Sequence, residues 1–244
     1  MRTVLVTGGA KRFGRAIVLE LARAGWNVVV HYNGSEGEAR ATASQAAALG
    51  AGATIVKADL AREDEVQALI GKAGTLDALI NNASIFEYDE LRSTTRASWD
   101  RHMEINLRAP FVLAQNFAAQ LGGREGAIVN IIDQRVLKPT PQFMSYGVSR
   151  AGLHWLTRTM AQALAPKVRV NAVAPGPSFI GARQSADAYE KQRASTPLGR
   201  GAEIDDLTGA VRYLLEARSV TGEMIAVDGG QHIAWQTPDV MVQE

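Results

Sequence analysis

The feature that most constrains this chain is a glycine-rich turn between an apolar run and a helical pattern. The run Val4–Val6 leads into Thr7–Gly14, which opens into a stretch with apolar residues at Ile17, Leu19 and Leu21. So tight a turn requires positive φ angles, which we expect Gly8 and Gly9 to adopt, while Gly14 lets the next helix pack close to the strand. The helix points its positive dipole end to where a pyrophosphate would lie, although such a turn also occurs as a purely structural connection.

Length and composition favour one α/β domain over residues 1–244. Of the 244 residues, 46% are hydrophobic, which is enough to bury a full core. The 26 basic and 25 acidic residues are interspersed and leave a formal charge of +1, so we expect no nucleic-acid or membrane partner. No apolar run approaches the roughly 18 residues of a membrane-spanning helix, and no signal-peptide pattern precedes the first strand. Because cysteine is absent, we expect no disulfide or thiolate metal site and a cytoplasmic location.

Strand and helix patterns alternate along the chain. Apolar runs of strand length lie at 4–6, 27–32, 53–58, 76–80, 127–132, 167–173 and 224–227. Helical patterns lie between them at 36–49, 63–70, 98–121, 142–165 and 203–215. This alternation predicts a single doubly wound parallel sheet of the Rossmann type, with seven strands in the order 3-2-1-4-5-6-7. The poorly patterned stretch at about 177–197 predicts a mobile loop with short helices over the ligand end of the sheet.

The second expected strand ends without an acidic residue, which bears on the nucleotide that such a turn binds. Folds of this type that prefer NAD usually place a carboxylate there for the adenosine ribose, whereas this strand ends in Tyr32-Asn33-Gly34-Ser35. No carboxylate is then present to repel a 2′-phosphate. Lys11 and Arg12, with Ser35 and the amides around it, can hold that phosphate, so we expect NADPH to be preferred over NADH. Lys11 is equally compatible with an ordinary solvated lysine.

Polar residues also follow the later strands, and open α/β sheets bind ligands at the carboxyl ends of their strands. Asp59 and Leu60 follow the third strand, where an adenine edge would be met, although Asp59 can equally cap the helix over 63–70. The other residues at strand ends are Asn81-Asn82-Ala83-Ser84-Ile85-Phe86 after the fourth strand, Asp133 after the fifth, and Ala174-Pro175-Gly176-Pro177 after the sixth.

The two longest helical patterns carry further candidates. Pro110 has no N–H and frees the backbone oxygen of Asn106 to bind water, although the proline can equally be a simple kink. Tyr146 and Arg150 stand at i and i+4, so we expect them to share one face of the helix over 142–165.

Together these motifs resemble the short-chain dehydrogenase/reductase family over essentially the whole chain. The matching elements are the glycine turn, Asn81-Asn82-Ala83, Asn106, Tyr146 with a basic residue four positions later, Pro175-Gly176 and Asp228-Gly229-Gly230. The resemblance implies a catalytic group of Tyr146, Arg150, Asp133 and Asn106. It also implies cofactor contacts from Gly8, Lys11, Arg12, Phe13, Gly14, Tyr32, Asn33, Ser35, Asp59, Leu60, Asn82, Ala83, Ser84, Pro175, Gly176 and Ser178.

Within the family, three departures together resemble pteridine reductases and dihydromonapterin reductases. Arg12 replaces the middle glycine of the turn, Ser84 and Phe86 follow Asn82-Ala83, and Asp133 stands thirteen residues before Tyr146, where most members carry serine. The resemblance implies that a pterin ring stacks on Phe86 and meets Arg12, Ser84, Asp133 and Tyr146. Phe86 is also compatible with lid or core packing, and Asp133 with a loop carboxylate.

A fourth departure is Arg150, which stands where the family has a lysine. That lysine binds the nicotinamide ribose, lowers the pKa of the tyrosine and passes protons onward. An arginine side chain, whose pKa exceeds about 12, keeps the charge and can hold ribose hydroxyls but cannot release a proton. Ribose hydroxyls and water on the Asn106 carbonyl can still refill Tyr146, so we expect reduced activity more readily than none.

The expected function is an NADPH-dependent reductase that transfers a hydride to a C=N or C=O bond of a small planar substrate, with a pterin-like ring favoured. Two alternatives stay open: a carbonyl or 3-oxoacyl reductase of the same family, and an NADPH-binding protein weakened by Arg150. The resemblance further implies a homotetramer assembled through the helices over 98–121 and 142–165 and the last strand region. We expect no metal site, because the four histidines lack ligand spacing and favour packing or surface positions: His31, His102, His154 and His232.

Overall fold

The centre of the molecule is a parallel sheet of seven strands in the order β3-β2-β1-β4-β5-β6-β7. The computed structural model describes residues 1–178, 180, 184–237 and 241. The strands are β1 (Thr3–Val6), β2 (Asn27–Tyr32), β3 (Ala53–Lys57), β4 (Ala78–Asn81), β5 (Gly126–Ile131), β6 (Val168–Pro175) and β7 (Met224–Val227). The predicted fold class and strand order are confirmed. The strand order reverses between β1 and β4, which is where ligands bind in sheets of this kind.

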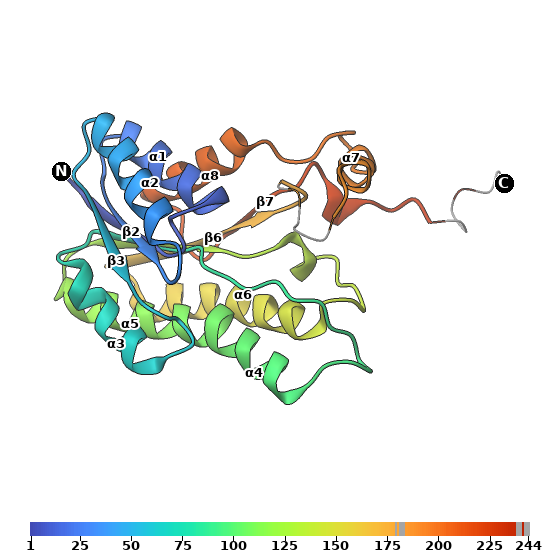
Figure 1. Ribbon diagram of the computed structural model, residues 1–244, viewed down its shortest axis with the longest axis horizontal. Coiled ribbons are helices and arrows are strands. Elements are labelled where there is room, and N and C mark those ends of the chain that lie inside the picture. Colours follow the sequence, from blue (N-terminus) through green and yellow to red (C-terminus); the bar gives the residue numbers. More distant parts are fainter. Residues whose placement is uncertain (179, 181–183, 238–240, 242–244) are drawn as a thin grey trace.

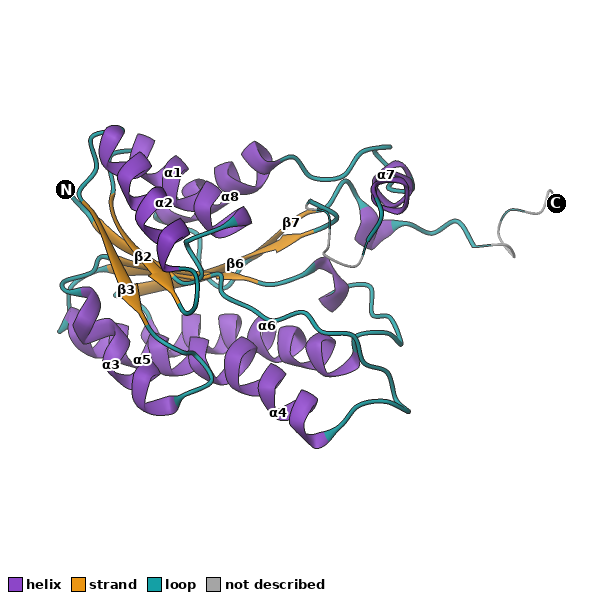
Figure 2. Cartoon of the chain, in the orientation of Figure 1, coloured by secondary structure: helices purple, strands orange, loops and turns teal. Residues whose placement is uncertain are grey.

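Helices cover both faces of the sheet (Figure 1 and Figure 2). One face carries α1 (Arg12–Arg23), α2 (Glu36–Ala48) and α8 (Ile204–Glu216). The other face carries α3 (Glu63–Ala73), α5 (Ala109–Leu121) and α6 (Met144–Leu164), with α4 (Arg96–Met103) packed on α6. The short helix α7 (Ala186–Ala194) lies beyond the end of β7 in Figure 1. Within the part of the chain described, no helix combines the length and apolar character that crossing a bilayer requires.

Side chains that alternate along each strand build two cores. Val4 and Val6 pack in the cluster beneath α1 and α8, whereas Leu5 between them packs in the cluster beneath α3 and α5. All three side chains are fully buried, and each such burial is worth about 1.5–3 kcal/mol. A strand covered on both faces needs apolar residues at every position, which explains the continuous apolar runs in the sequence.

The helices differ from the sequence prediction in two ways: some begin or end at other residues, and one predicted helix is interrupted in its middle. The expected helix over 98–121 is divided: α4 ends at Met103, a π-helical turn spans Glu104–Arg108, and α5 follows. Pro110 lies in the first turn of α5 and has no N–H to donate to Asn106 within the π-helical turn. Helix α6 begins at Met144 rather than residue 142, because Phe143 adopts a left-handed backbone with φ 58°. The predicted loop at about 177–197 contains α7, and positions 179 and 181–183 of it lie outside the described residues.

The glycine turn depends on the absence of a Cβ at two positions. Gly8 adopts the expected positive φ of 62°, and a Cβ on Gly14 would lie only 2.1 Å from the Gly8 carbonyl oxygen. The prediction of a positive φ at Gly9 is wrong: Arg12 takes it instead, at 51°. Gly9 serves close approach, since its Cβ would lie 3.0 Å from the Val6 carbonyl oxygen. The start of α1 therefore rests directly on the end of β1.

His31 on β2 forms an unexpected buried link to this turn. Its Nδ1 accepts from the Gly8 N–H at 3.0 Å, and its Nε2 donates to the Ala58 carbonyl oxygen at 3.1 Å. These bonds define a neutral ring with the proton on Nε2. Burial lowers the pKa of His31 to about 4, against smaller opposing effects of the Ala58 carbonyl and the Asp59 charge. The ring joins the glycine turn to the residues that follow β3.

Substitution of Gly14 by alanine tests the close approach in the turn. We expect Gly14→Ala to lower the free energy of unfolding by about 1–3 kcal/mol, because the new methyl group forces the turn away from the helix. The matched control is Gly71→Ala in α3, where a Cβ would meet nothing within 4 Å. There alanine should stabilise the helix by about 0.5–1 kcal/mol. Urea unfolding of both variants measures the difference, and native stability in Gly14→Ala would contradict the steric argument.

The buried His31 predicts a pH dependence of stability. In the unfolded chain the ring titrates at its ordinary pKa of 6.5, whereas in the folded protein its pKa is about 4. Unfolding therefore takes up a proton in this window. The contribution of His31 to the free energy of unfolding is fully present above pH 6.5 and is lost as the pH falls toward 4. The full contribution is on the order of 3 kcal/mol. We expect the free energy of unfolding in urea, plotted against pH from about 7 to about 5, to fall less steeply for His31→Asn than for native protein. The half-buried control His154→Asn should follow the native protein. Parallel slopes in His31→Asn and native protein would contradict the assignment.

Candidate functional site

The carboxyl ends of the central strands bring most of the predicted site residues to one edge of the sheet. The glycine turn follows β1, the cluster at 81–86 begins at the last residue of β4, Asp133 follows β5, and Pro175 ends β6. Tyr146 projects from the first turn of α6. Segments far apart in the sequence thus surround one region, as the topology of a parallel sheet requires.

Tyr146 and Asp133 form a direct pair at this edge. The Tyr146 hydroxyl donates to Asp133 Oδ2 at 2.9 Å, and Tyr146 is only 5% exposed. Burial raises the pKa of Tyr146, the Asp133 charge raises it further, and the positive charge of Arg150 lowers it. The phenol therefore holds its proton. Arg150 lies on the same helix face as predicted, with its guanidinium carbon 5.1 Å from the centre of the Tyr146 ring.

Arg150 is buried and only partly hydrogen-bonded. Its side chain is 2% exposed, and its Nη1 donates to the Ile131 carbonyl oxygen at 3.3 Å. Its Nε is buried and has no hydrogen-bond partner among the described residues. A buried unpaired donor costs about 1–3 kcal/mol, so this N–H fits a ligand oxygen such as a ribose hydroxyl.

An aromatic wall stands beside Tyr146. Phe86 and Phe143 stack with ring centres 4.3 Å apart and planes 15° apart, and Phe86 meets the Tyr146 ring edge-on at 4.7 Å. The Arg135 guanidinium lies 5.3 Å from each of the two phenylalanine rings and 3.4 Å from Asp133 Oδ2. Phe86 stays 42% exposed, so both stacking on a ligand and packing as a lid remain compatible with its position. Sequence reasoning missed Phe143 and Arg135. Their nearness in the chain was the available signal, since Phe143 lies three residues before Tyr146 and Arg135 two residues after Asp133.

The side chain of Asn106 hydrogen-bonds two other segments of the chain. It is fully buried, donates from Nδ2 to the Ile85 carbonyl oxygen at 3.0 Å, and accepts from the Ile85 N–H at 2.9 Å. The same Nδ2 lies 3.2 Å from the Ser149 hydroxyl on α6. Asn106 therefore joins the π-helical turn, the loop after β4 and the helix of Tyr146, while the predicted water on its carbonyl stays a prediction.

The polar cluster after β4 lies directly against the glycine turn. Asn82 Nδ2 donates to the carbonyl oxygens of Thr7 and Gly8 at 2.9 and 3.3 Å. The Thr7 hydroxyl accepts from the N–H groups of Asn82 and Ala83 at 2.9 and 3.0 Å. Ser84, the next residue, is exposed. The predicted cofactor contacts from both segments therefore lie side by side.

The expected adenosine side of the site holds one residue that the sequence argument missed. Lys11 Nζ pairs with Glu38 Oε1 at 3.2 Å, and both side chains are more than half exposed. The end of β2 carries no carboxylate, as expected, but α2 brings the Glu38 carboxylate to Lys11 in the glycine turn. The Lys11–Glu38 ion pair is solvated, so it contributes little to stability. Arg12 Nη2 donates to the Ile180 carbonyl oxygen at 3.1 Å.

The remaining predicted adenosine contacts are placed as follows. Ser35 occupies the N-cap position of α2, Asn33 is exposed beside it, and Tyr32 is buried at the end of β2. Leu60 is buried in the core beneath α3 and α5, and Phe13 is partly buried against the core beneath α1. The alternative role of Asp59 as the cap of α3 is excluded, because the N-cap is Arg62, and Asp59 Oδ1 accepts from the Ala61 N–H at 3.0 Å.

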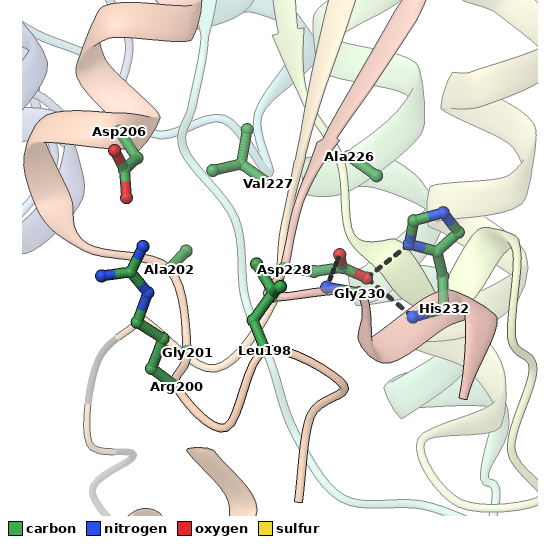
Figure 3. Close-up of a pocket in the computed structure, with 11 residues that line it drawn as sticks. Leu198, Arg200, Gly201, Ala202, Asp206, Ala226, Val227, Asp228, Gly230 and His232 are labelled. Atoms are coloured by element: carbon green, nitrogen blue, oxygen red, sulfur yellow. Dashed lines mark hydrogen bonds and ion pairs between the residues drawn. The ribbon is translucent and has the colours of Figure 1, made fainter. Parts of the chain in front are cut away.

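A separate cavity of about 270 Å³ lies at the end of β7 (Figure 3). Asp228 Oδ2 accepts from the N–H and the ring Nδ1 of His232, both at 2.8 Å, and its Oδ1 accepts from the Gly230 N–H at 2.9 Å. A Cβ on Gly176 would lie 2.6 Å from the Asp228 Cα, so this glycine is needed for backbone contact, and its carbonyl accepts from the Ser178 hydroxyl at 2.8 Å. Neither Tyr146 nor Asp133 lines the cavity. No group of three metal-ligating side chains exists within the described ranges.

Two crystal structures are similar to this chain over nearly its whole length. FolM alternative dihydrofolate reductase 1 from Brucella canis, complexed with NADP, is 45% identical with a TM-score of 0.92, covering 99% of this chain and 98% of that chain. The protein of the same description from Brucella suis, also in complex with NADP, is 46% identical with a TM-score of 0.94, covering 98% of each chain.

Matches to curated proteins and to a family model are equally extensive. The 3-oxoacyl-(acyl-carrier-protein) reductase FabG of Staphylococcus epidermidis is 34% identical over 242 residues, covering 95% of this chain and 99% of that protein. A family model described as enoyl-(acyl carrier protein) reductase matches residues 8–232. Because these matches span most of the chain and agree with the motifs at the sheet edge, the chain belongs to the short-chain dehydrogenase/reductase family.

Proposed function

We propose that the protein is an NADPH-dependent reductase that transfers a hydride to a C=N or C=O bond of a small planar substrate, with a pterin-like ring favoured. The observation that carries this proposal is the Tyr146–Asp133 pair, with a 2.9 Å hydrogen bond, beside the stacked rings of Phe86 and Phe143. A proton donor next to an aromatic wall suits reduction of a flat ring. The similarity to two proteins described as alternative dihydrofolate reductases in complex with NADP supports the same substrate class and cofactor.

The residues at the sheet edge fit a dinucleotide. Gly8 and Gly14 keep the backbone open at the start of α1, where the helix dipole favours a pyrophosphate. Arg150 Nε is a buried donor that a ribose hydroxyl would satisfy. Lys11 is exposed beside the end of β2 and can turn from Glu38 to a 2′-phosphate. When bound, the nicotinamide supplies the hydride.

The chain's own residues then orient the substrate and supply the proton. Phe86, 42% exposed, offers a face on which a flat ring can stack. The Asp133 carboxylate can accept from amino and ring N–H groups of an aminopyrimidine edge, while Arg12 and Ser84 offer donors to ring carbonyls or phosphate. Tyr146 donates its proton to the reduced atom, and Arg150 stabilises the phenolate that remains. Because an arginine does not release a proton, refilling of Tyr146 passes through water or ribose hydroxyls.

A 3-oxoacyl reductase is the second candidate. It is supported by the 34% identity to FabG and by the family model described as an enoyl-(acyl carrier protein) reductase. The same Tyr146 would protonate the ketone oxygen, but Phe86, Phe143 and Arg135 would have to accommodate a flexible acyl chain instead of a ring. Asp133, which can bind an aminopyrimidine, would have no such partner on an acyl chain.

Oxidation of NADPH by purified protein separates these candidates. Native protein and Arg150→Lys are assayed with a dihydropterin, a 3-oxoacyl thioester and a panel of simple ketones. We expect the native protein to reduce the dihydropterin with the highest kcat/KM, because its site matches a planar ring. Turnover of the thioester alone would favour the second candidate. A silent native protein whose Arg150→Lys variant is active would identify an NADPH-binding protein, and silence of both forms would overturn the proposal.

Removal of the Tyr146 hydroxyl tests the proton donor. We expect Tyr146→Phe to lower kcat by about 10²–10⁴-fold, because general acid catalysis contributes a factor of that size. The Kd of NADPH, measured by fluorescence, should stay within about twofold, since the hydroxyl bonds to Asp133 rather than to the glycine turn. Tyr213→Phe, at an exposed position on α8, is the control and should keep native kcat. A Tyr146→Phe enzyme with native kcat would assign the proton to another group.

A further inference from the structure

Helix α6, which carries Tyr146, has no N-terminal cap of its own. Phe143 occupies the N-cap position with a left-handed backbone, φ 58° and ψ 48°, and its side chain has no hydrogen-bond acceptor. The first turn contains no acidic residue. A helix begins with backbone N–H groups that lack intrahelical partners, so acceptors for this turn must come from another part of the chain.

Asp89, in the loop after β4, supplies those acceptors. It is 2% exposed, and its Oδ1 accepts from the Ser145 N–H at 3.2 Å. Its Oδ2 accepts a short hydrogen bond from the Ser145 hydroxyl. Its backbone carbonyl accepts from the Phe143 N–H at 2.7 Å. The same carbonyl accepts a longer bond from the Met144 N–H at 3.4 Å, so one residue receives four donors from the start of α6. Its negative charge lies where the helix dipole is positive.

His102 on α4 completes this network. Its ring is fully buried, and its Nδ1 lies 2.7 Å from the Ser145 hydroxyl oxygen and 3.1 Å from the Ser98 carbonyl oxygen. Its Nε2 accepts from the Glu87 N–H at 3.3 Å. The ring is therefore neutral with its proton on Nδ1, in agreement with a pKa that burial lowers. The Ser145 hydroxyl receives from His102 and donates to Asp89, so its rotation is fixed.

The network joins two segments that border the reaction site. Ser145 directly precedes Tyr146, and Phe143 forms the aromatic wall with Phe86. Phe86 itself stands in the same loop as Asp89, three residues before it. We infer that Asp89 is a positioning residue that sets Tyr146 relative to Phe86, by capping α6 from a distant loop through Ser145 and Phe143. This inference rests on the proposed function for the role of Tyr146.

The substitution Asp89→Asn is a sharp test because it keeps the size of the side chain and changes only its chemistry. The amide has one oxygen to accept and an NH₂ group that can only donate. With the amide oxygen on the Ser145 N–H, the NH₂ group faces the Ser145 hydroxyl, whose proton loses its acceptor; with the amide turned over, the Ser145 N–H loses its acceptor instead. Glu90→Gln is the matched control, since the Glu90 side chain is exposed and its nearest partner is the Tyr88 hydroxyl, at 3.3 Å.

The experiment compares native protein, Asp89→Asn and Glu90→Gln in three measurements: kcat and KM on the substrate that the native protein turns over, the Kd of NADPH, and amide hydrogen exchange of peptides covering 143–150. We expect Asp89→Asn to lower kcat by about 10–100-fold, the size of effect that misplacement of a reacting group produces. The Kd of NADPH should stay within about twofold, and exchange at the start of α6 should rise by about tenfold, because the cap loses one acceptor and the negative charge that the helix dipole favours. Glu90→Gln should match native protein in all three.

The outcomes distinguish this inference from the proposed function. A native protein that reduces only a 3-oxoacyl thioester defeats the pterin proposal, and the Asp89 test then proceeds on that substrate. In a native protein without turnover, hydrogen exchange still decides whether Asp89 anchors α6. Native kcat together with native exchange in Asp89→Asn would overturn the inference, as would a general loss of NADPH affinity equal to the loss of kcat. If Asp89→Asn does not fold, Ser145→Ala removes one of the donors to Asp89 and should lower kcat in the same direction by a smaller factor.

Discussion

The hydroxyl of Thr7 joins the two strands between which the order of the sheet reverses, and the site depends on this junction. It donates to the Ile80 carbonyl oxygen at 3.2 Å and accepts from the N–H groups of Asn82 and Ala83 at 2.9 and 3.0 Å. Thr7 follows β1 and Asn82 follows β4, so the two connections leave the carboxyl edge of the sheet side by side. The glycine turn and the polar cluster that leads to Phe86 must then diverge from one point, which is the crevice where a ligand can enter.

Most of the fold could be predicted from the sequence, because alternation of strand and helix patterns is a local property that restricts the topology to very few choices. The contacts within the site were harder to predict from the sequence. Lys11 and Glu38 are 27 residues apart in the chain, and Asp89 and Ser145 are 56 apart. A pattern along the chain reports the face on which a residue lies, not which distant residue it meets. For the same reason His31 was expected only to pack or face solvent, although both of its ring nitrogens are bonded.

Local geometry also departed from expectation where the backbone is strained. A positive φ of 51° at Arg12, in the position of the family's middle glycine, costs about 1–2 kcal/mol in a residue with a side chain. The other special positions of this turn are glycines required by close backbone contacts, whereas Arg12 carries a full side chain. It lies next to the region where the cofactor and substrate of the proposed reaction would meet. Strain of this kind persists where surrounding contacts over-determine the backbone, and the hydrogen bond from Arg12 to the Ile180 carbonyl oxygen is one such contact. The substitution is therefore better explained by what the guanidinium can bind than by stability.

Asp133 and Arg150 act on Tyr146 in opposite directions. Burial is the largest cause of the raised pKa of the phenol; the carboxylate raises that pKa further and the guanidinium lowers it. Proton donation leaves a phenolate, which Arg150 favours and Asp133 opposes. Asp133 also accepts from the Arg135 N–H at 2.8 Å, so its charge is already shared. A substrate whose amino group bonds to Asp133 would draw that charge away from Tyr146 and lower the pKa of the phenol. Under the proposed function, binding of an aminopyrimidine edge would therefore itself prepare Tyr146 to release its proton, which a simple ketone cannot do.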